Sequence, residues 1–279
     1  MLTRSLSRLF SISLVAFTAN ACRPNGANSR VPAETPQHAF EIPAHPHVAT
    51  VDVTPAARAA VEATDRSADD RALDAGRHPA EMLSFFGIAP GQRVAELFAG
   101  GGYTAELLAR TVGDTGQVFG QNNRLIIERF ARAPWESRLA KPVNHNVVRV
   151  DRELDAPLPP EAHDLDAVLL VLAYHDTVWM HTDRAAMNRA IYRALRPGGV
   201  FGIVDHSAIA GSGVLDVQTF HRIEEPSLVE EVLAAGFRLD TEADFLRNPA
   251  DTRDWNDSPR AAGNRRGTSD RFVLRFVRP

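Results

Sequence analysis

A short apolar run ends in three consecutive glycines in the stretch Val94-Ala95-Glu96-Leu97-Phe98-Ala99-Gly100-Gly101-Gly102. The apolar part predicts a buried strand, and residues 103–112 after the glycines predict a helix with two leucines on its apolar face. Glycines in such a turn permit positive φ angles and a close approach of a ligand to the backbone. Because the start of a helix presents free N–H groups, this strand–turn–helix unit indicates a binding site at its turn.

Two classes of ligand use such a turn, and Glu96 distinguishes between them. Dinucleotides place a pyrophosphate on the helix start, and a carboxylate at the end of the preceding strand repels it. Nucleoside cofactors without phosphate instead need an acidic group there, which pairs with a cationic amino-acid group. Glu96 favours the second class, although the glycine pattern alone fits either one. A turn that only packs the strand against the helix, with Glu96 in solvent, is the remaining alternative.

The apolar patterns along the rest of the chain alternate between helix and strand. Strands separated by helices indicate an α/β fold with a doubly wound sheet, and ligands of such sheets bind at the carboxyl ends of the strands. The expected strands are residues 93–98, 117–121, 146–150, 166–173, 200–204, 237–239 and 272–277, and the expected helices are 56–64, 79–87, 103–112, 125–132, 187–195 and 226–235.

The first 21 residues have the features of a secretory signal peptide. Two arginines precede an apolar run at residues 9–19, which is shorter than the ~20 residues needed to span a bilayer. Ala19-Asn20-Ala21 is a small-x-small cleavage site, and Cys22 stands where a bacterial lipoprotein is lipidated. We expect residues 1–21 to direct export to the periplasm, or to a membrane that holds the protein through lipidated Cys22. An uncleaved N-terminus is the alternative.

The next segment reads as a linker, and the remainder as one domain. Residues 22–55 contain 6 of the 18 prolines and few residues able to form a core. Residues 56–279 then form the expected α/β domain. The formal net charge of −4 argues against nonspecific binding of nucleic acid. The single cysteine excludes intramolecular disulfides and cysteine-rich metal sites.

With its acidic residue ahead of a glycine turn, the sequence resembles the class I S-adenosylmethionine-dependent methyltransferases. The resemblance covers most of residues 79–277 and includes Asp166-Ala167-Val168 and Leu195-Arg196-Pro197-Gly198-Gly199. It implies a Rossmann-like sheet of seven strands, mostly parallel, with the last strand antiparallel between the fifth and sixth. More narrowly, four motifs resemble a group of predicted bacterial methyltransferases that are often exported: Gly101-Gly102-Tyr103, Tyr174-His175-Asp176, His221-Arg222-Ile223 and Asp270-Arg271-Phe272-Val273-Leu274.

The resemblance implies S-adenosylmethionine as cofactor and assigns residues to it. Glu96 faces its amino-acid part, and the turn lies against it. Asn122 stands at the end of the second strand, where the family usually has an acid that binds the ribose hydroxyls. Asp151, after the third strand, matches the residue that meets the adenine amino group; a solvated loop acid is the alternative. The expected cofactor-binding residues are Glu96, Phe98, Ala99, Gly100, Gly101, Gly102, Tyr103, Asn122 and Asp151.

Candidates for the chemistry follow the fourth and fifth strands. Methyl transfer needs a positioned nucleophile, and a base helps when the acceptor is a hydroxyl or a carbon acid. Histidine is suited to that role near neutral pH, although each histidine has a structural or surface role as its alternative. The expected catalytic residues are Tyr174, His175, Asp176, Asp205 and His206, with His221 and Arg222 in the following segment.

The same residues suggest a second interpretation. Asp176, Asp205 and His206 are metal-ligand types, and some small-molecule O-methyltransferases hold a divalent metal near these strand ends. The other aspartate of that subgroup falls on an apolar position here, so we expect no metal. The polar segment 248–270 is either a lid over the acceptor or a solvated loop.

Together these observations predict methyl transfer to a small-molecule acceptor, because the chain has neither an extra substrate domain nor a basic face. One rival is a non-catalytic exported protein that retains the fold, since S-adenosylmethionine is made in the cytosol. The other is an NAD(P)-dependent oxidoreductase, which requires the turn to tolerate Glu96.

Overall fold

The computed structural model describes residues 48–279. The expected signal peptide, the lipidation site at Cys22 and the linker up to residue 47 lie outside the described residues. Within the described part, no helix combines the length and the apolar character that crossing a membrane requires.

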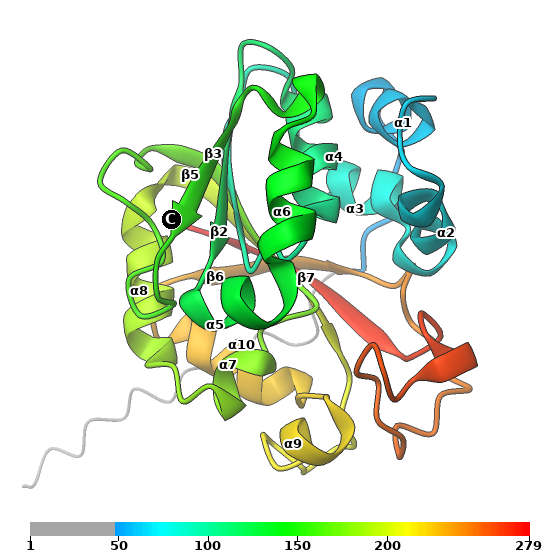
Figure 1. Ribbon diagram of the computed structural model, residues 1–279. Coiled ribbons are helices and arrows are strands. Elements are labelled where there is room, and N and C mark those ends of the chain that lie inside the picture. The colour runs from blue at the N-terminus through cyan, green and yellow to red at the C-terminus, as the bar shows by residue number, and fades with distance from the viewer. Residues whose placement is uncertain (1–47) are drawn as a thin grey trace, which may run out of the picture. The chain divides into compact units, whose positions relative to one another are not determined.

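Seven strands form one sheet in the order β3-β2-β1-β4-β5-β7-β6 (Figure 1). The pairs from β3 to β5 are parallel, whereas β7 is antiparallel to both β5 and β6. This order and direction confirm the expected Rossmann-like fold. The strands are β1 (Arg93–Leu97), β2 (Gln117–Asn122), β3 (Val147–Asp151), β4 (Leu165–Val171), β5 (Leu195–His206), β6 (Arg238–Ala243) and β7 (Arg271–Val277).

Helices cover both faces of the sheet (Figure 1). The described residues form α1 (Pro55–Glu62), α2 (Ala68–Arg77), α3 (Pro79–Phe85), α4 (Tyr103–Val112), α5 (Arg124–Ile126), a π-helical turn η1 (Ile127–Ala131), α6 (Arg132–Leu139), η2 (Pro142–Asn144), α7 (Asp176–Trp179), α8 (Arg184–Ala194), α9 (Val217–Phe220), α10 (Glu225–Leu233) and η3 (Gly263–Arg265). Because side chains alternate between the faces of a strand, neighbouring residues of β4 enter different cores. Val168 packs with α8 and α10, while Leu169 packs with α1, α3 and α4.

The structure differs from the sequence-based expectation at several elements. Helix α2 was not expected, because its sequence ADDRALDAGR is polar around most of its circumference. The expected helix at 125–132 is a short helix and a π-helical turn that continue into α6. Residues 195–199, expected as a helix end and turn, belong to β5. The end of the expected linker also packs on the domain, since Val48 forms an isolated parallel bridge with Glu242 of β6.

Candidate functional site

The residues expected to form the site lie at the carboxyl ends of the parallel strands, in two groups. The glycine turn, residues 98–102, joins β1 to α4 beside the ends of β2 and β3. The histidine cluster is formed by residues after β4, at the end of β5 and after α9, and comprises His175, Asp176, Asp205, His206 and His221. This is the edge at which ligands of doubly wound sheets bind.

The glycine turn has a backbone conformation that ordinary residues rarely adopt. Phe98, Gly100 and Gly102 have φ angles of +63°, +55° and +82°. A Cβ atom on Gly102 would lie 2.5 Å from a ring carbon of Trp135, so only glycine fits there. Phe98 adopts the left-handed conformation with a full side chain, which costs about 1 kcal/mol or more. Its N–H donates to Oε1 of Gln121 at 3.0 Å, which helps to hold that conformation.

Asn122, the expected partner of the ribose, braces the glycine turn. Its fully buried side chain accepts a hydrogen bond from the N–H of Gly100 at 2.8 Å and donates one to the Gly100 carbonyl at 3.1 Å. Next to it, the N–H of Ala99 donates to the Gln121 carbonyl at 2.8 Å. A side-chain amide retains one further proton and one further lone pair, so a ribose contact by Asn122 would be shared with the turn.

Glu96 is buried beside this turn with one oxygen unsatisfied. Glu96 is a residue of β1 with a buried side chain, and its Oε2 has no hydrogen-bond partner among the described residues. Burial raises the pKa of Glu96 to about 8, against the opposing effects of the Thr104 hydroxyl and the Arg77 guanidinium. An unpaired buried acid is costly, so the position suits a ligand with a cationic group.

Arg77, at the end of α2, is a site residue that the sequence analysis missed. Its guanidinium carbon lies 4.5 Å from the centroid of the Tyr103 ring, and the described residues offer it no hydrogen bond or ion pair. Burial lowers the pKa of Arg77, while Tyr103 and Glu96 favour its charge. A signal was present in the sequence, because Ser67 caps a segment with two acids in its first turn and Arg77 in its last.

Tyr103 and Gly101 attach the turn to neighbouring helices. The Tyr103 hydroxyl donates to Asp74 at 2.6 Å, and Arg66 pairs with the same carboxylate at 2.7 Å. The Gly101 carbonyl accepts a hydrogen bond from Nε of Arg138 at 3.1 Å. These contacts hold the turn in place, and the Tyr103 hydroxyl has Asp74 as its hydrogen-bond partner.

Asp151 lies at the end of β3, opposite Asn122 in the β2–β3 register. Its carboxylate is exposed and accepts from Nε of Arg149 at 2.9 Å. The structure therefore places Asp151 one strand beyond Asn122, with its side chain engaged by a neighbour on the same strand.

His175 and Asp205 form a fully buried pair at the ends of β4 and β5. Nδ1 of His175 lies 2.6 Å from Oδ1 of Asp205, and the His175 N–H donates to Oδ2 at 2.8 Å. Burial opposes a charge on the imidazole, but the Asp205 and Asp176 carboxylates outweigh it and raise the pKa of His175 to about 9. Burial also opposes ionisation of Asp205, but His175 lowers the pKa of that carboxyl. Nε2 of His175 has no hydrogen-bond partner among the described residues.

Asp176 and His221 lie against the free side of His175. Oδ1 of Asp176 is 3.4 Å from Nε2 of His175 and 3.6 Å from Nε2 of His221. The two imidazole rings stack edge-on with centroids 4.2 Å apart. The Trp179 indole donates to Oδ1 of Asp176 at 2.7 Å and orients that carboxylate. Burial and the nearby charge of His175 lower the pKa of His221 to about 4.

His206 faces the segment 248–270, which the sequence left open as lid or loop. Its Nδ1 lies 2.9 Å from the Ser269 hydroxyl and 2.5 Å from Asp257, and both of these residues are buried. Arg222 is also fully buried and pairs with Asp251 of the same segment at 2.7 Å. Asp251, Asp257 and Ser269 thus attach the segment beside the cluster, while most of residues 259–268 are exposed. Neither Asp257 nor Ser269 stands in a motif by which the sequence could identify it.

Tyr174 does not join the histidine cluster, although it precedes His175 in the chain. Its buried hydroxyl donates to Glu231 of α10 at 2.8 Å and accepts from the Asn188 amide of α8 at 2.9 Å. Burial raises the pKa of Tyr174 well above its ordinary value. The hydroxyl expected to be catalytic is instead part of the packing between the sheet and these two helices.

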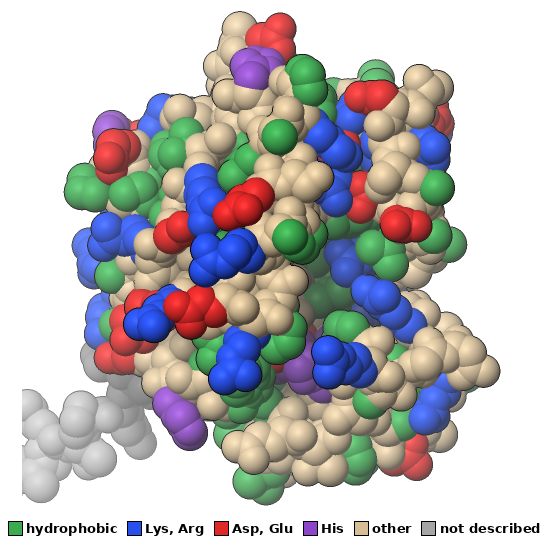
Figure 2. Space-filling model, in the orientation of Figure 1, with side chains coloured by type: hydrophobic (Ala, Val, Ile, Leu, Met, Phe, Trp, Pro, Cys, Tyr) green, Lys and Arg blue, Asp and Glu red, His purple; other side chains and the backbone are tan. Residues whose placement is uncertain are grey.

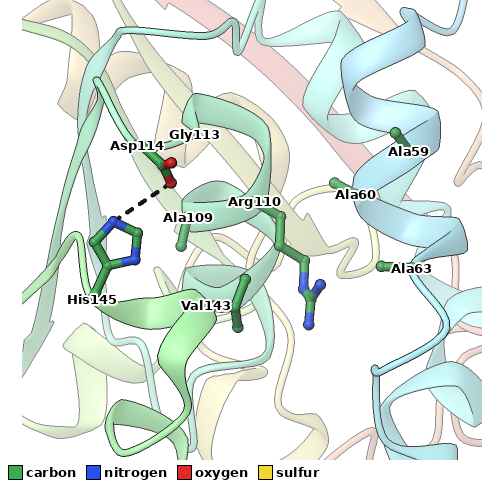
Figure 3. Close-up of a pocket in the computed structure, with 9 residues that line it drawn as sticks. All are labelled: Ala59, Ala60, Ala63, Ala109, Arg110, Gly113, Asp114, Val143 and His145. Carbon is green, nitrogen blue, oxygen red and sulfur yellow. Dashed lines mark ion pairs between the residues drawn. The ribbon is translucent and has the colours of Figure 1, made fainter.

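Two depressions differ in their relation to these groups. A cavity of about 300 Å³ lies between α1 and α4, lined by four alanines with Arg110, Gly113, Asp114, Val143 and His145 (Figure 3). Several of these residues directly precede β2 and β3, which places the cavity at the amino ends of the strands, away from the site. Figure 2 shows a hollow between the α5–α6 region and the segment 248–270. Basic side chains lie at its rim, and a histidine lies within it.

No protein-family model matches the chain. The structure is similar to a proposed sarcosine dimethylglycine methyltransferase from Galdieria sulphuraria, with 15% identity over 82% of this chain and 92% of that one and a TM-score of 0.54. It is also similar to a chain in the complex between the Haloferax volcanii Trm112 methyltransferase activator and a proposed methyltransferase, with 18% identity over 82% and 100% and a TM-score of 0.51. At these identities the likeness concerns the fold.

Proposed function

We propose that this protein, which has the fold of class I methyltransferases, transfers the methyl group of S-adenosylmethionine to a small-molecule acceptor. The fold is supported by the seven-stranded topology and by the similar solved structures. The sequence around Glu96 matches the cofactor motif of this fold, and its position at the strand ends agrees with where such folds bind ligands.

The observation that carries the proposal is the unsatisfied carboxylate of Glu96 beside the glycine turn. The ammonium group of the cofactor would stabilise the ionised carboxylate, which burial alone disfavours. Arg77 offers a guanidinium that lies over the Tyr103 ring but has no hydrogen-bond or ion-pair partner among the described residues. A guanidinium suits the carboxylate of the same amino-acid group. Glu96 and Arg77 together therefore fit a zwitterionic amino acid, whereas the Glu96 carboxylate would repel a pyrophosphate.

The acceptor would lie against the histidine cluster. His175, held by Asp205, presents Nε2 beside Asp176, and His206 is held by the segment 248–270. Imidazole and carboxylate groups suit an acceptor that has a hydroxyl or another polar nucleophile. Tyr174 has no part in this proposal, because its hydroxyl faces α8 and α10.

Isothermal titration calorimetry of the full chain with S-adenosylmethionine and S-adenosylhomocysteine tests the proposal. Glu96→Gln should weaken binding of both by at least tenfold, since a charge-assisted hydrogen bond is replaced by a neutral one. Glu231→Gln is the matched control, because that carboxylate pairs with Arg184 away from the turn. Equal affinities of the Glu96→Gln variant and the wild type would overturn the site assignment.

The rival functions have distinct outcomes in the same measurements. A wild-type protein that binds neither nucleoside would support a non-catalytic protein that retains the fold. Quenching or enhancement of NADPH fluorescence on binding would support an oxidoreductase. Binding of S-adenosylmethionine without binding of NADPH supports methyl transfer.

We also propose that residues 1–21 direct export and that Cys22 carries a lipid anchor ahead of a linker. The support is the sequence pattern around Ala19-Asn20-Ala21-Cys22. Metabolic labelling with a palmitate analogue in a bacterial host, followed by membrane fractionation, tests this. The wild type should be labelled and pelleted, and Cys22→Ser should be unlabelled. An unlabelled wild type that remains in the cytosolic fraction would contradict both export and lipidation.

A further inference from the structure

Three polar side chains of the histidine cluster converge on one point. His175 and Asp176 begin α7, and His221 follows α9. One nitrogen or oxygen from each of the three lies within 4.8 Å of the other two. Oδ1 of Asp176 is 3.4 Å from Nε2 of His175 and 3.6 Å from Nε2 of His221. Ligands about 2.0–2.1 Å from a tetrahedral zinc ion lie roughly 3.3–3.4 Å from one another, so the side chains nearly have the spacing of a metal site.

The unpartnered nitrogen of His175 points to a ligand. The side chain is completely buried, yet Nε2 makes no hydrogen bond to the described residues, even to Asp176 at 3.4 Å. Nδ1 is taken by Asp205 at 2.6 Å. Histidine ligands of metals usually donate their second nitrogen to a carboxylate in this way, which fixes the tautomer and turns the other nitrogen toward the metal.

Outer contacts also orient the remaining groups. The Trp179 indole donates to Asp176 and leaves further lone pairs of the carboxylate available. Asp205 in turn accepts from the His175 and His206 backbone N–H groups, at 2.8 Å each, and is fully buried. Asp205 and Asp176 place carboxylates on two sides of the His175 ring, so a metal ion at Nε2, where it takes the place of a proton, lies close to negative charge.

We propose that His175, Asp176 and His221 bind a divalent transition-metal ion, with Asp205 as the carboxylate that orients His175. Two imidazoles and one carboxylate suit zinc, iron, manganese, cobalt or nickel better than calcium or magnesium, which prefer oxygen ligands. Three protein ligands leave coordination positions open. The side chains of Asp176 and His221 are 13% and 21% exposed, so one side of the site is reachable from solvent.

This ligand set differs from the one that the sequence suggested and set aside. Asp205 lies behind His175, and His206 is directed to Ser269 and Asp257, with its ring centroid 5.5 Å from that of His175. His221 takes their place. A metal at this point would present its open positions to an oxygen of the methyl acceptor, a role that rests on the proposed function; metal binding itself does not.

Titration of the metal-free full chain with Zn²⁺, and with Co²⁺ read by visible absorption, tests the proposal. His38, His45 and His47 are replaced by Gln in every protein, so that N-terminal histidines do not contribute. We expect one ion per chain and a Co²⁺ spectrum of four- or five-coordination. His221→Ala and Asp176→Asn should each weaken binding by 100-fold or more, while Asp205→Asn, acting through His175, should weaken it 10–100-fold.

Two controls make the result interpretable. His145→Ala removes a histidine at the opposite edge of the sheet and should leave the affinity unchanged. Circular dichroism and thermal melting verify that His221→Ala is folded, and if Asp176→Asn unfolds, His221→Ala alone decides. Absence of stoichiometric binding, or equal affinities of His221→Ala and the wild type, would overturn the site. Because no nucleoside is present, a protein that binds the metal but not S-adenosylmethionine would keep this inference and lose the proposed function.

Discussion

The glycine turn and the histidine cluster occupy the same edge of the sheet, but they are built in opposite ways. The turn is one continuous stretch of chain, and its backbone is held by Gln121 and Asn122 of the adjacent strand. The cluster joins side chains from the ends of β4 and β5 and from the segment after α9. Continuity makes the turn visible as a motif, whereas the cluster exists only once the sheet has formed.

Both regions contain a buried polar atom without a partner among the described residues. Beside the turn this atom is Oε2 of Glu96, and in the cluster it is Nε2 of His175. Such atoms are costly unless a ligand satisfies them. The comparison suggests that each region is completed by a cation, an ammonium group at the turn and a metal ion at the cluster.

Asp205→Ala should have the largest effect, because the cluster depends on this one carboxylate. It removes the acceptor of hydrogen bonds from the His175 side chain and from two backbone N–H groups in a fully buried position. We expect a loss of about 3–5 kcal/mol in the free energy of unfolding, measured by urea denaturation. The exposed Asp151→Ala should cost less than about 1 kcal/mol, and equal losses would contradict the difference between the regions.

Gly102→Ala probes the turn in the same measurement. The new Cβ meets the Trp135 ring at 2.5 Å in a left-handed conformation, so we expect a loss of about 3 kcal/mol. Gly87→Ala is the matched control, since Gly87 follows α3 with a φ of +70°, in the turn that the bond from the Ile88 N–H to the Leu83 carbonyl closes, and nothing lies within 4 Å of the added carbon. It should cost only about 1 kcal/mol. Similar losses would show that conformation, rather than the Trp135 contact, requires glycine at 102.

Glu96→Gln should change the pH dependence of stability. The pKa of Glu96 is about 8 in the folded protein and 4.5 in the unfolded chain, so the folded state holds a proton that the unfolded state has lost. The wild type therefore loses stability between about pH 5 and pH 8, by up to about 1.4 kcal/mol per pH unit. Relative to it, Glu96→Gln should gain stability over that range and level off above it, as urea titrations at several pH values would reveal. A constant difference would mean that Glu96 is ionised throughout.

Tyr174→Phe should have the smallest effect on the free energy of unfolding, and it tests whether Tyr174 belongs to the cluster. The loss of the bonds to Glu231 and Asn188 should cost about 1 kcal/mol. Binding of S-adenosylmethionine and of Zn²⁺ should equal that of the wild type in calorimetry. A tenfold loss of either affinity would place Tyr174 back in the site.

Much of the fold was predictable because its signals are local. The apolar strands and the helix after the glycines agree with the structure. The antiparallel last strand agrees too, but it was implied by the family resemblance and not by a local pattern. Helix α2 was not predicted because it lacks an apolar stripe. Arg77 at its end, which lies over the Tyr103 ring, was missed for the same reason. The residues expected to bind the cofactor form a motif in the sequence, but the bracing role of Asn122 depends on a contact across 22 residues of chain.

The sequence by itself determined the order of strands and helices, the glycine turn and the acid that precedes it. Hydrophobic periodicity and the special conformations of glycine act between neighbours in the chain, so these features can be read directly from it. Only the tertiary structure decided that Tyr174 faces α8 and α10, that His206 meets Ser269 and that His221 joins His175 and Asp176. The direction of a side chain at a strand end is set by contacts with residues distant in sequence, and those contacts form only when the sheet and its helices pack.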